Sequence, residues 1–158
     1  MKKAQPIQEI QVVGFYIGND EYAINIGNVR EIVSMVDIRK VPRAPKFVEG
    51  VINLRGHIIS IMDLRKRFEV QSAVDTHQAK ILIVEFGKSQ LGMIVDNVSE
   101  VFRLNSDQLE ATPDLFSGSI DSQYIQGVGK MGDRIIILLD VKRLLSTEEQ
   151  NQLVGLKT

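Results

Sequence analysis

Residues 50–65 contain two short apolar runs separated by a polar break at residues 53–57. The runs are rich in β-branched residues and are bounded by turn residues, which favours paired strands over a helix. We therefore predict a β-hairpin here, with its turn at Arg55-Gly56.

The same hydrophobic pattern occurs a second time. Residues 47–68 align without a gap on residues 124–145, at an offset of 124 − 47 = 77. Residues 15–32 align in the same way on residues 84–101, at an offset of 84 − 15 = 69. The difference between the offsets places an insertion between residues 101 and 124. We therefore expect one domain over residues 1–158 with an internal repeat, whose units at about 11–78 and 80–145 form two lobes.

The rest of the pattern predicts short strands and turns with little helix. Asp63 is placed to cap a short helix over residues 64–68, and a capping box at Ser146 precedes a C-terminal helix at about 147–155. Apolar spacings of three and four favour one or two helical turns at residues 29–33. Further strands are expected at residues 10–17, 22–26, 80–86 and 91–95. Without long helical crossovers, this order favours two small β-barrels packed face to face.

Composition fits a folded protein that is free of disulfides. A chain of 158 residues can form one domain or two small lobes that share a core. Its hydrophobic content of 44% argues against disorder, and a net charge of −1 gives no electrostatic reason to expect nucleic acid or an anionic membrane. The absence of cysteine excludes thiolate metal sites and fits a reducing compartment. Since no stretch of about 18 apolar residues occurs, we expect a cytoplasmic protein that does not insert into a membrane.

No residue set predicts catalysis. Residues 127–132 match GxGxxG, but a dinucleotide site needs this pattern before a helix, and here a strand is expected to follow. His57 and His77 lack the neighbouring groups that a metal site or a general base requires. Asp63 and Asp140 occupy equivalent repeat positions, which suggests helix caps. We predict no enzyme, no metal and no cofactor.

A nucleic-acid module is the alternative from a different class. Small barrels can bind single strands through stacked aromatic side chains over a basic groove. Three tyrosines, six phenylalanines and no tryptophan leave few such platforms. The candidate groove is the basic run Arg39, Lys40, Arg43 and Lys46. A small barrel that binds nucleic acid or a small ligand therefore stays as the alternative, and steeply salt-dependent oligonucleotide binding would support it.

An ordered set of short motifs runs from about Gln11 to Glu149. In the first half these are Val29-Arg30-Glu31-Ile32, residues 45–50, Asn53-Leu54-Arg55-Gly56 and Asp63-Leu64-Arg65, and in the second half residues 92–96, 98–101 and 132–139. Together they resemble the CheW family of bacterial chemotaxis coupling proteins. The resemblance implies a mainly β fold of two SH3-like, five-stranded barrel lobes on a shared hydrophobic core, with short helices.

The resemblance also implies partners. Members of this family are non-catalytic adaptors without a cofactor, and they couple the histidine kinase CheA to methyl-accepting chemoreceptors. One side is expected to bind the regulatory domain of the kinase, and another the cytoplasmic tip of the receptor. The expected location is the cytoplasm, at membrane-associated receptor arrays.

The family's receptor-binding surface lies in a groove between the barrels. Its Val-x-Glu-Ile element falls here on Val29, Glu31 and Ile32, and the repeat equivalents Val98 and Val101 would line the other side. Such a surface suits an amphipathic helical hairpin, because apolar burial supplies affinity and a few polar groups set the register. Each apolar member could equally be an ordinary core residue.

Two further sets of residues are expected to contact partners. Glu31 and Arg55 match charged positions of the family, and we expect them to pair near the groove and to orient the receptor. The repeat equivalent of Arg55 is Gly132, so the arginine is not a structural need of both copies. The kinase contact is the least defined, with Ile38 and Val41 on an apolar edge as its candidates.

Overall fold

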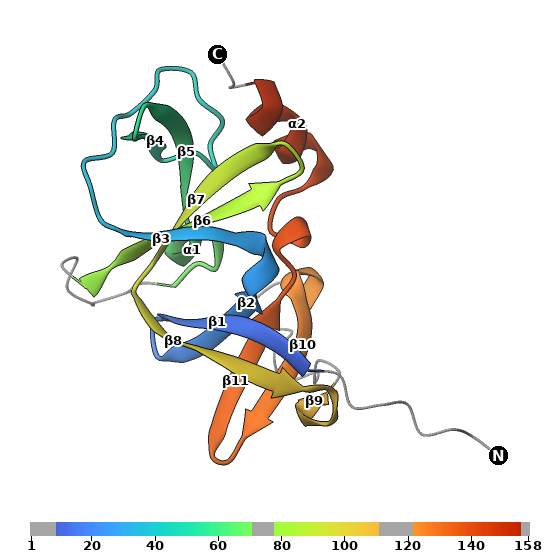
Figure 1. Ribbon diagram of the computed structural model, residues 1–158. Coiled ribbons are helices and arrows are strands. Elements are labelled where there is room, and N and C mark those ends of the chain that lie inside the picture. Colours follow the sequence, from blue (N-terminus) through green and yellow to red (C-terminus); the bar gives the residue numbers. More distant parts are fainter. Residues whose placement is uncertain (1–8, 71–77, 111–121, 156–158) are drawn as a thin grey trace.

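The computed structural model describes residues 9–70, 78–110 and 122–155, which form two β-sheets and hence two lobes (Figure 1). Lobe 1 has the strand order β8-β1-β2-β11-β10-β9 and lobe 2 the order β3-β6-β7-β5-β4. The strands of lobe 1 are β1 (Glu9–Ile17), β2 (Asp20–Asn25), β8 (Asn97–Asn105), β9 (Leu109–Glu110), β10 (Ile125–Met131) and β11 (Arg134–Leu139). Those of lobe 2 are β3 (Val29–Ser34), β4 (Gly50–Leu54), β5 (His57–Asp63), β6 (Lys80–Phe86) and β7 (Ser89–Val95). The predicted two-lobed β fold is confirmed, and lobe 1 gains the two-residue strand β9.

The two sheets have the same order of repeat-equivalent strands. At the offset of 69, β1 and β2 correspond to β6 and β7, and at the offset of 77, β4 and β5 correspond to β10 and β11. Each sheet therefore has one parallel pair at the equivalent place, β2 with β11 and β5 with β7, while its other pairs are antiparallel.

The repeat units do not each form a lobe. Lobe 2 is the continuous stretch from β3 to β7, whereas lobe 1 combines the N-terminal hairpin β1–β2 with strands from β8 onwards. The expectation that residues 11–78 and 80–145 fold as separate lobes is therefore corrected, because the first hairpin of each unit joins the sheet of the other. Both hairpins are buried along most of their length. A strand that is buried on both faces lies between two cores. The repeat shows which strands are equivalent, but it does not show which strands they pair with.

Three apolar clusters follow from this exchange. The largest is shared and takes side chains from both lobes, among them Phe15, Tyr22, Met62, Leu82 and Ile137. The second lies within lobe 2 and includes Ile52, Ile59, Ile61, Ile81 and Ile83. The third lies within lobe 1 and consists of Val12, Ala23, Leu104, Ile136 and Leu138. The predicted shared hydrophobic core is thus present, with a smaller core on each side of it.

The helices are short and are capped by the residues that the sequence predicted. Asp63 caps α1 (Leu64–Arg67), since its Oδ1 accepts from the Arg65 backbone N–H at 2.9 Å. Before α2 (Thr147–Gly155), Ser146 Oγ accepts from Glu149 N at 3.1 Å and Glu149 Oε1 accepts from Ser146 N at 2.9 Å. The other helical turns are 3-10 segments: η1 (Ile26–Asn28), η3 (Ser106–Gln108), η5 (Ser122–Tyr124) and η6 (Val141–Arg143).

Residues 29–33 are part of a strand, so the predicted helical turns there are wrong. Only η1, just before them, is helical, and the following residues form β3. Along β3, half-buried and exposed side chains alternate, as they do in a strand with one covered face. The apolar residues here are spaced three and four apart, as in a helix, only by coincidence. They form a strand because they pair with β6, which lies some fifty residues further along the chain.

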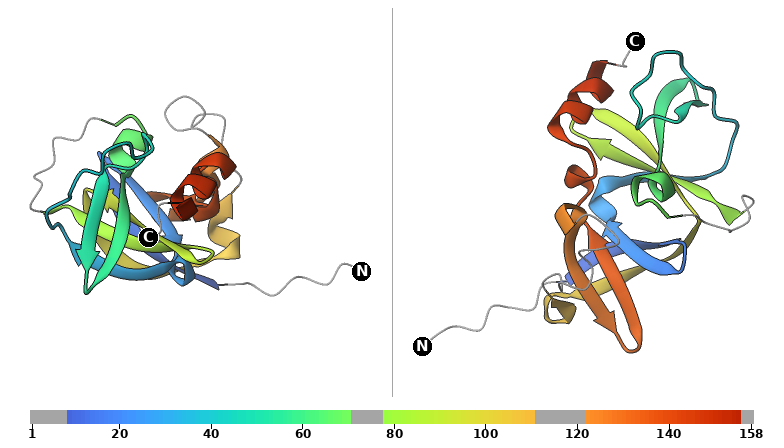
Figure 2. Two further views of the ribbon diagram at one scale, coloured as in Figure 1. Left: turned by 90° about the horizontal axis from the view of Figure 1, so that it is seen from above. Right: turned by 180° about the vertical axis from the view of Figure 1, so that it is seen from behind.

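Lobe 2 also carries a long loop and the C-terminal helix. Residues 35–49 run as an extended loop around the outer end of this lobe, and α2 lies near the same end (Figure 2). Leu153 of α2 is buried there. In the part of the chain that the structure describes, no helix is long and apolar enough to cross a membrane.

Candidate functional site

The predicted receptor-binding residues lie on one edge strand of each sheet. Val29, Glu31 and Ile32 are on β3, and Val98 and Val101 are on β8. We call these five residues the edge-strand surface. Because β3 pairs with β6 and β8 pairs with β1, each strand leaves one side without a partner strand. An unpaired edge is a ready template for binding another chain.

Burial divides the apolar members of this surface into two kinds. Val29 and Val98 are partly buried and pack against the shared core. Ile32 and Val101, their neighbours three residues on, are 40% and 47% exposed. The core interpretation therefore describes the two valines nearest the lobe junction, while Ile32 and Val101 are free to contact a partner.

A bulge interrupts both edge strands at the equivalent place. In lobe 2 the register shifts between Val29 and Glu31, and in lobe 1 it shifts where Val98 and Val101 face β1. A bulge adds an unpaired residue and re-aims the side chains around it. In each strand the bulge lies between the half-buried valine and the exposed apolar residue. In β3, Glu31 lies at this bulge.

Glu31 and Arg55 form a two-bonded ion pair. Arg55 Nη1 donates to Glu31 Oε1 at 2.8 Å, and Nη2 bonds the second oxygen. The hydrogen bond from Arg55 lowers the pKa of Glu31. Since 69% of the Arg55 side chain is exposed, the pair lies at the surface and not in the core.

The turn that holds Arg55 would suit glycine better. Arg55 has a φ of +51°, in the left-handed region where a side chain is strained. Its repeat equivalent, Gly132, has nearly the same φ of +60°. An arginine at a position where the other copy has glycine points to a use for the side chain, because such strain tends to gather at functional sites.

Lobe 1 contains a charged cluster that the sequence did not predict. Arg134 Nη2 donates to Glu21 Oε2 at 2.7 Å, and its Nε donates to Glu21 Oε1 at 3.2 Å. Glu21 is only 8% exposed, and Ser99 Oγ donates to it at 3.0 Å. The third nitrogen of Arg134, Nη1, donates to Glu100 Oε1 at 3.0 Å. The alignment of Glu100 with Glu31 was the one signal in the sequence that could have drawn attention to this cluster.

A second unpredicted cluster ties the two lobes together. Asp96, which is 1% exposed, lies where the chain passes from β7 to β8. Its Oδ2 accepts from Gly18 N at 2.7 Å, and its own N–H donates to Tyr16 O at 3.0 Å. Arg65 bonds both Asp96 and Asp63, the residue that caps α1. A buried carboxylate with these partners fixes the crossover between the lobes.

The two kinase-contact candidates differ in availability. Ile38 is partly buried against the core of lobe 2. Val41 lines a cavity of about 650 Å³, together with Val51, Ile58 and Leu153. Ile58 is 60% exposed at this cavity. Val41 is therefore the candidate that a partner could reach.

Residues that might have carried chemistry have structural places instead. Asp63 and Asp140 are helix caps, as predicted, and Asp140 Oδ1 accepts from Lys142 N at 3.1 Å. The GxGxxG stretch lies in β10 and its turn, and a strand follows it. His57 is exposed, and His77 lies outside the described residues. Among the residues that the structure describes, no cluster of His, Cys, Asp or Glu could hold a metal ion.

Comparison with known proteins points in one direction. The family model for the CheW-like domain matches residues 11–149. The chain is 37% identical over 135 residues to the chemotaxis protein CheW of Klebsiella aerogenes, covering 85% of this chain and 81% of that protein. It is 35% identical over 153 residues to the chemotaxis protein CheW of Treponema pallidum, covering 94% and 89%. The crystal structure of the scaffolding protein TtCheW from Thermoanaerobacter tengcongensis superposes with a TM-score of 0.79 at 34% identity, covering 89% and 94% of the two chains.

Proposed function

This chain belongs to the CheW-like domain family and has the chemotaxis scaffold role of that family, and we propose that it couples chemoreceptors to the kinase CheA. In this role it binds the cytoplasmic tip of a methyl-accepting receptor on one surface and the regulatory domain of the kinase on another. It works in the cytoplasm, at receptor arrays on the membrane. A scaffold needs two surfaces and no catalytic residue.

The observation that carries the receptor half of this proposal is the Glu31–Arg55 pair beside exposed Ile32. The pair is held at a turn whose backbone favours glycine, so its side chains are kept at a cost to the fold. Ile32, the next residue along β3, exposes a large apolar side chain on the other face of the same unpaired edge. An amphipathic helical hairpin would bury the apolar side chain and align its polar groups with the ion pair.

We propose that the kinase binds at the outer end of lobe 2. Val41 and exposed Ile58 line one cavity there, at the β4 edge. Residue 39 already extends this edge, since Arg39 N donates to Val51 O at 2.9 Å and Val51 N donates to Arg39 O at 2.8 Å. The barrel of a kinase regulatory domain could pack on this end while the receptor occupies β3 and β8.

Calorimetric titration of the protein with the kinase regulatory domain, and then with a receptor-tip fragment, tests both halves. Ile32→Glu should weaken receptor binding by at least about tenfold, because it places a charge where apolar surface is buried. Kinase binding should be unchanged. Ile135→Glu is the matched control for the receptor titration, since Ile135 is also exposed, at 54%, but lies on β11.

Val41→Glu should give the reverse result, with weakened kinase binding and unchanged receptor binding. Two separable losses would support an adaptor with distinct sites. If the parent protein bound neither partner, the coupling role would be refuted for this chain. If Ile32→Glu bound the receptor as tightly as the parent, the edge-strand surface would be the wrong site.

A further inference from the structure

Lobe 1 carries a second surface carboxylate at the position that matches Glu31. At the offset of 69, Glu31 corresponds to Glu100, and Glu100 lies between Val98 and Val101 as Glu31 lies between Val29 and Ile32. Glu100 is held by Arg134 at 3.0 Å, and the two side chains are 53% and 39% exposed. Each lobe therefore presents a carboxylate–guanidinium pair whose carboxylate directly precedes the exposed apolar residue of the edge strand.

The two lobes build this pair from different arginine positions. At the offset of 77, the equivalent of Arg55 is Gly132, and the equivalent of Arg134 is His57. Simple duplication of the first pair would have placed an arginine at position 132. Lobe 1 instead brings its arginine from the first residue of β11 to the equivalent carboxylate. The feature common to both lobes is thus the surface pair and not one backbone position.

The structural task of Arg134 does not involve Glu100. Buried Glu21 takes Nε and Nη2 of Arg134 and the hydroxyl of Ser99. Nη1 is left for Glu100, on the solvent side. An exposed pair of this kind adds little to stability because water screens it. Glu100 is therefore available to a partner without loss of the interior contacts.

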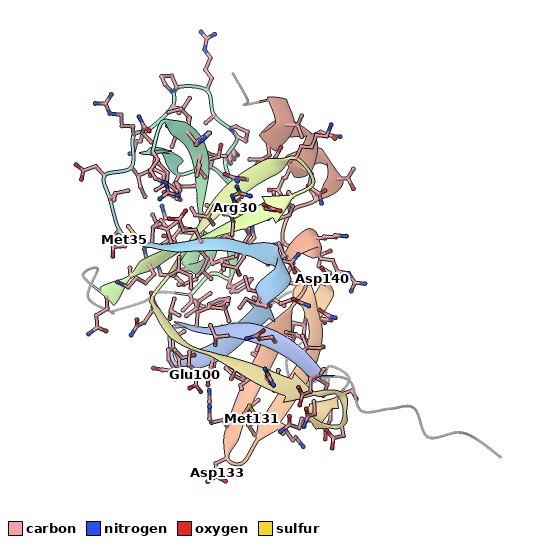
Figure 3. The ribbon with its side chains drawn as sticks, viewed as in Figure 1. Arg30, Met35, Glu100, Met131, Asp133 and Asp140 are labelled. Atoms are coloured by element: carbon pink, nitrogen blue, oxygen red, sulfur yellow. The ribbon has the colours of Figure 1, made fainter. Side chains whose placement is uncertain are left out.

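Glu100 lies on the lobe 1 side of the edge-strand surface. Figure 3 labels it below β1, with β3 of lobe 2 above. The repeat relates the exposed apolar residues, Ile32 and Val101, and also the carboxylates that precede them in each edge strand.

We propose that Glu100, held in place by Arg134, is a second polar contact for the receptor, paired by the internal repeat with Glu31 and Arg55. This inference rests on the proposed coupling function. An antiparallel helical hairpin presents similar faces in opposite directions, so it matches a surface whose two halves are related by the repeat. Each helix would offer a lysine, an arginine or a side-chain amide to one carboxylate, because these groups donate hydrogen bonds to a carboxylate.

The test compares three charge reversals in calorimetric titration with the receptor-tip fragment. Glu31→Lys and Glu100→Lys should each weaken binding by about tenfold, the loss of one charge-assisted contact. Glu110→Lys is the matched control, because Glu110 is also 53% exposed, lies in lobe 1 and pairs with Lys130. The receptor affinity of Glu110→Lys should stay within about twofold of that of the parent, a much smaller change than the loss of one such contact would cause. Glu100→Gln should fall between Glu100→Lys and the parent, because it removes the charge and keeps an acceptor.

The outcomes separate this inference from the function on which it rests. Normal binding by Glu100→Lys alongside weak binding by Glu31→Lys would overturn the second contact and leave the coupling role intact. No binding by the parent would remove both. If Glu100→Lys bound both the receptor and the kinase more weakly and also had a lower melting temperature, Glu100 would support the fold. That result would also overturn the inference.

Discussion

Lobe 1 and lobe 2 share a strand order but fill their interiors in different ways. In lobe 2, Ile83 is buried in the core beside Gly92, 3.3 Å from the position of an added Cβ, with Ile61 and Ile81 closer still. In lobe 1 the residue that corresponds to Ile83 is Gly14, and the side chains of Ser99 and Phe102 fill the space over it, with Phe102 2.8 Å from the position of a Cβ. The large side chain thus comes from different repeat positions in the two lobes, because Phe102 corresponds to the smaller Val33. The repeat therefore preserves the order of the strands and not the residues that fill each interior.

The charged pairs differ in the same way. In lobe 1, Arg134 reaches inward to buried Glu21 as well as outward to Glu100. In lobe 2, Arg55 lies at the tip of the hairpin and bonds Glu31 at the surface. One arginine therefore supports the fold, whereas the other can be replaced without disturbing the core. This difference makes lobe 2 the place where stability and partner binding can be separated by mutation.

The largest predicted effect comes from removing the arginine of lobe 1. Arg134→Ala leaves the carboxylate of Glu21 buried without its counter-charge, and we expect a loss of about 2–3 kcal/mol in the free energy of unfolding. Arg55→Ala should leave that free energy almost unchanged, since both partners of its pair are reached by water. Urea denaturation of the two variants measures the difference. Equal losses would show that the two pairs have the same structural role.

A smaller effect is predicted at the two turns. Arg55→Gly should raise the melting temperature by about 1–3 °C, because glycine accepts the positive φ without strain. The same variant should bind the receptor fragment more weakly. Gly132→Ala is the mirror control in lobe 1 and should cost about 1 kcal/mol, although nothing lies within 4 Å of the added Cβ. A lower melting temperature for Arg55→Gly would mean that the arginine stabilises its lobe.

Local features could be predicted from the sequence and distant pairings could not. The hairpin around Arg55-Gly56, the cap at Asp63 and the capping box at Ser146 depend on neighbouring residues, so their patterns identified them. The meeting of Glu31 with Arg55 followed from the family resemblance. By contrast, Glu21 and Arg134 are 113 residues apart and meet through the parallel pairing of β2 with β11. No local pattern specifies that pairing.

The exchange of hairpins between the repeats could not be predicted from the sequence for the same reason. A hairpin such as β1–β2 can pair in register with any edge that offers matching apolar faces. The sequence shows two equivalent hairpins but does not assign either of them to a sheet. That choice depends on the shared core, where both hairpins bury their second face. The role of β3 as an edge strand depends on the same choice, and its local apolar spacing, which also fits a helix, does not specify that role.

The smallest predicted effect concerns a contact that only one copy of the repeat can form. Arg67 of α1 donates two hydrogen bonds to Glu149 of α2, at 2.7 and 3.2 Å. Its repeat equivalent is the buried Leu144, which has no charge to offer. Partial burial acts to raise the pKa of Glu149, but hydrogen bonds from Arg67 and Ser146 outweigh it and lower the pKa below its ordinary value of 4.5.

This shift makes one contact between α1 and α2 sensitive to acid. A carboxylate whose pKa is lower in the folded state stabilises the fold fully above its unfolded value of about 4.5. That contribution is lost as the pH falls through the lowered folded value. Glu149→Gln should therefore melt below the parent at pH 7, by at most about 3 °C, and this difference should close as the pH drops below about 4.5. Glu148→Gln, one residue away on α2, is the control, because it removes a charge from the same first turn and leaves the Arg67–Glu149 contact in place. A gap that persisted at low pH would show that the Arg67–Glu149 contact stabilises the fold through packing and not through charge.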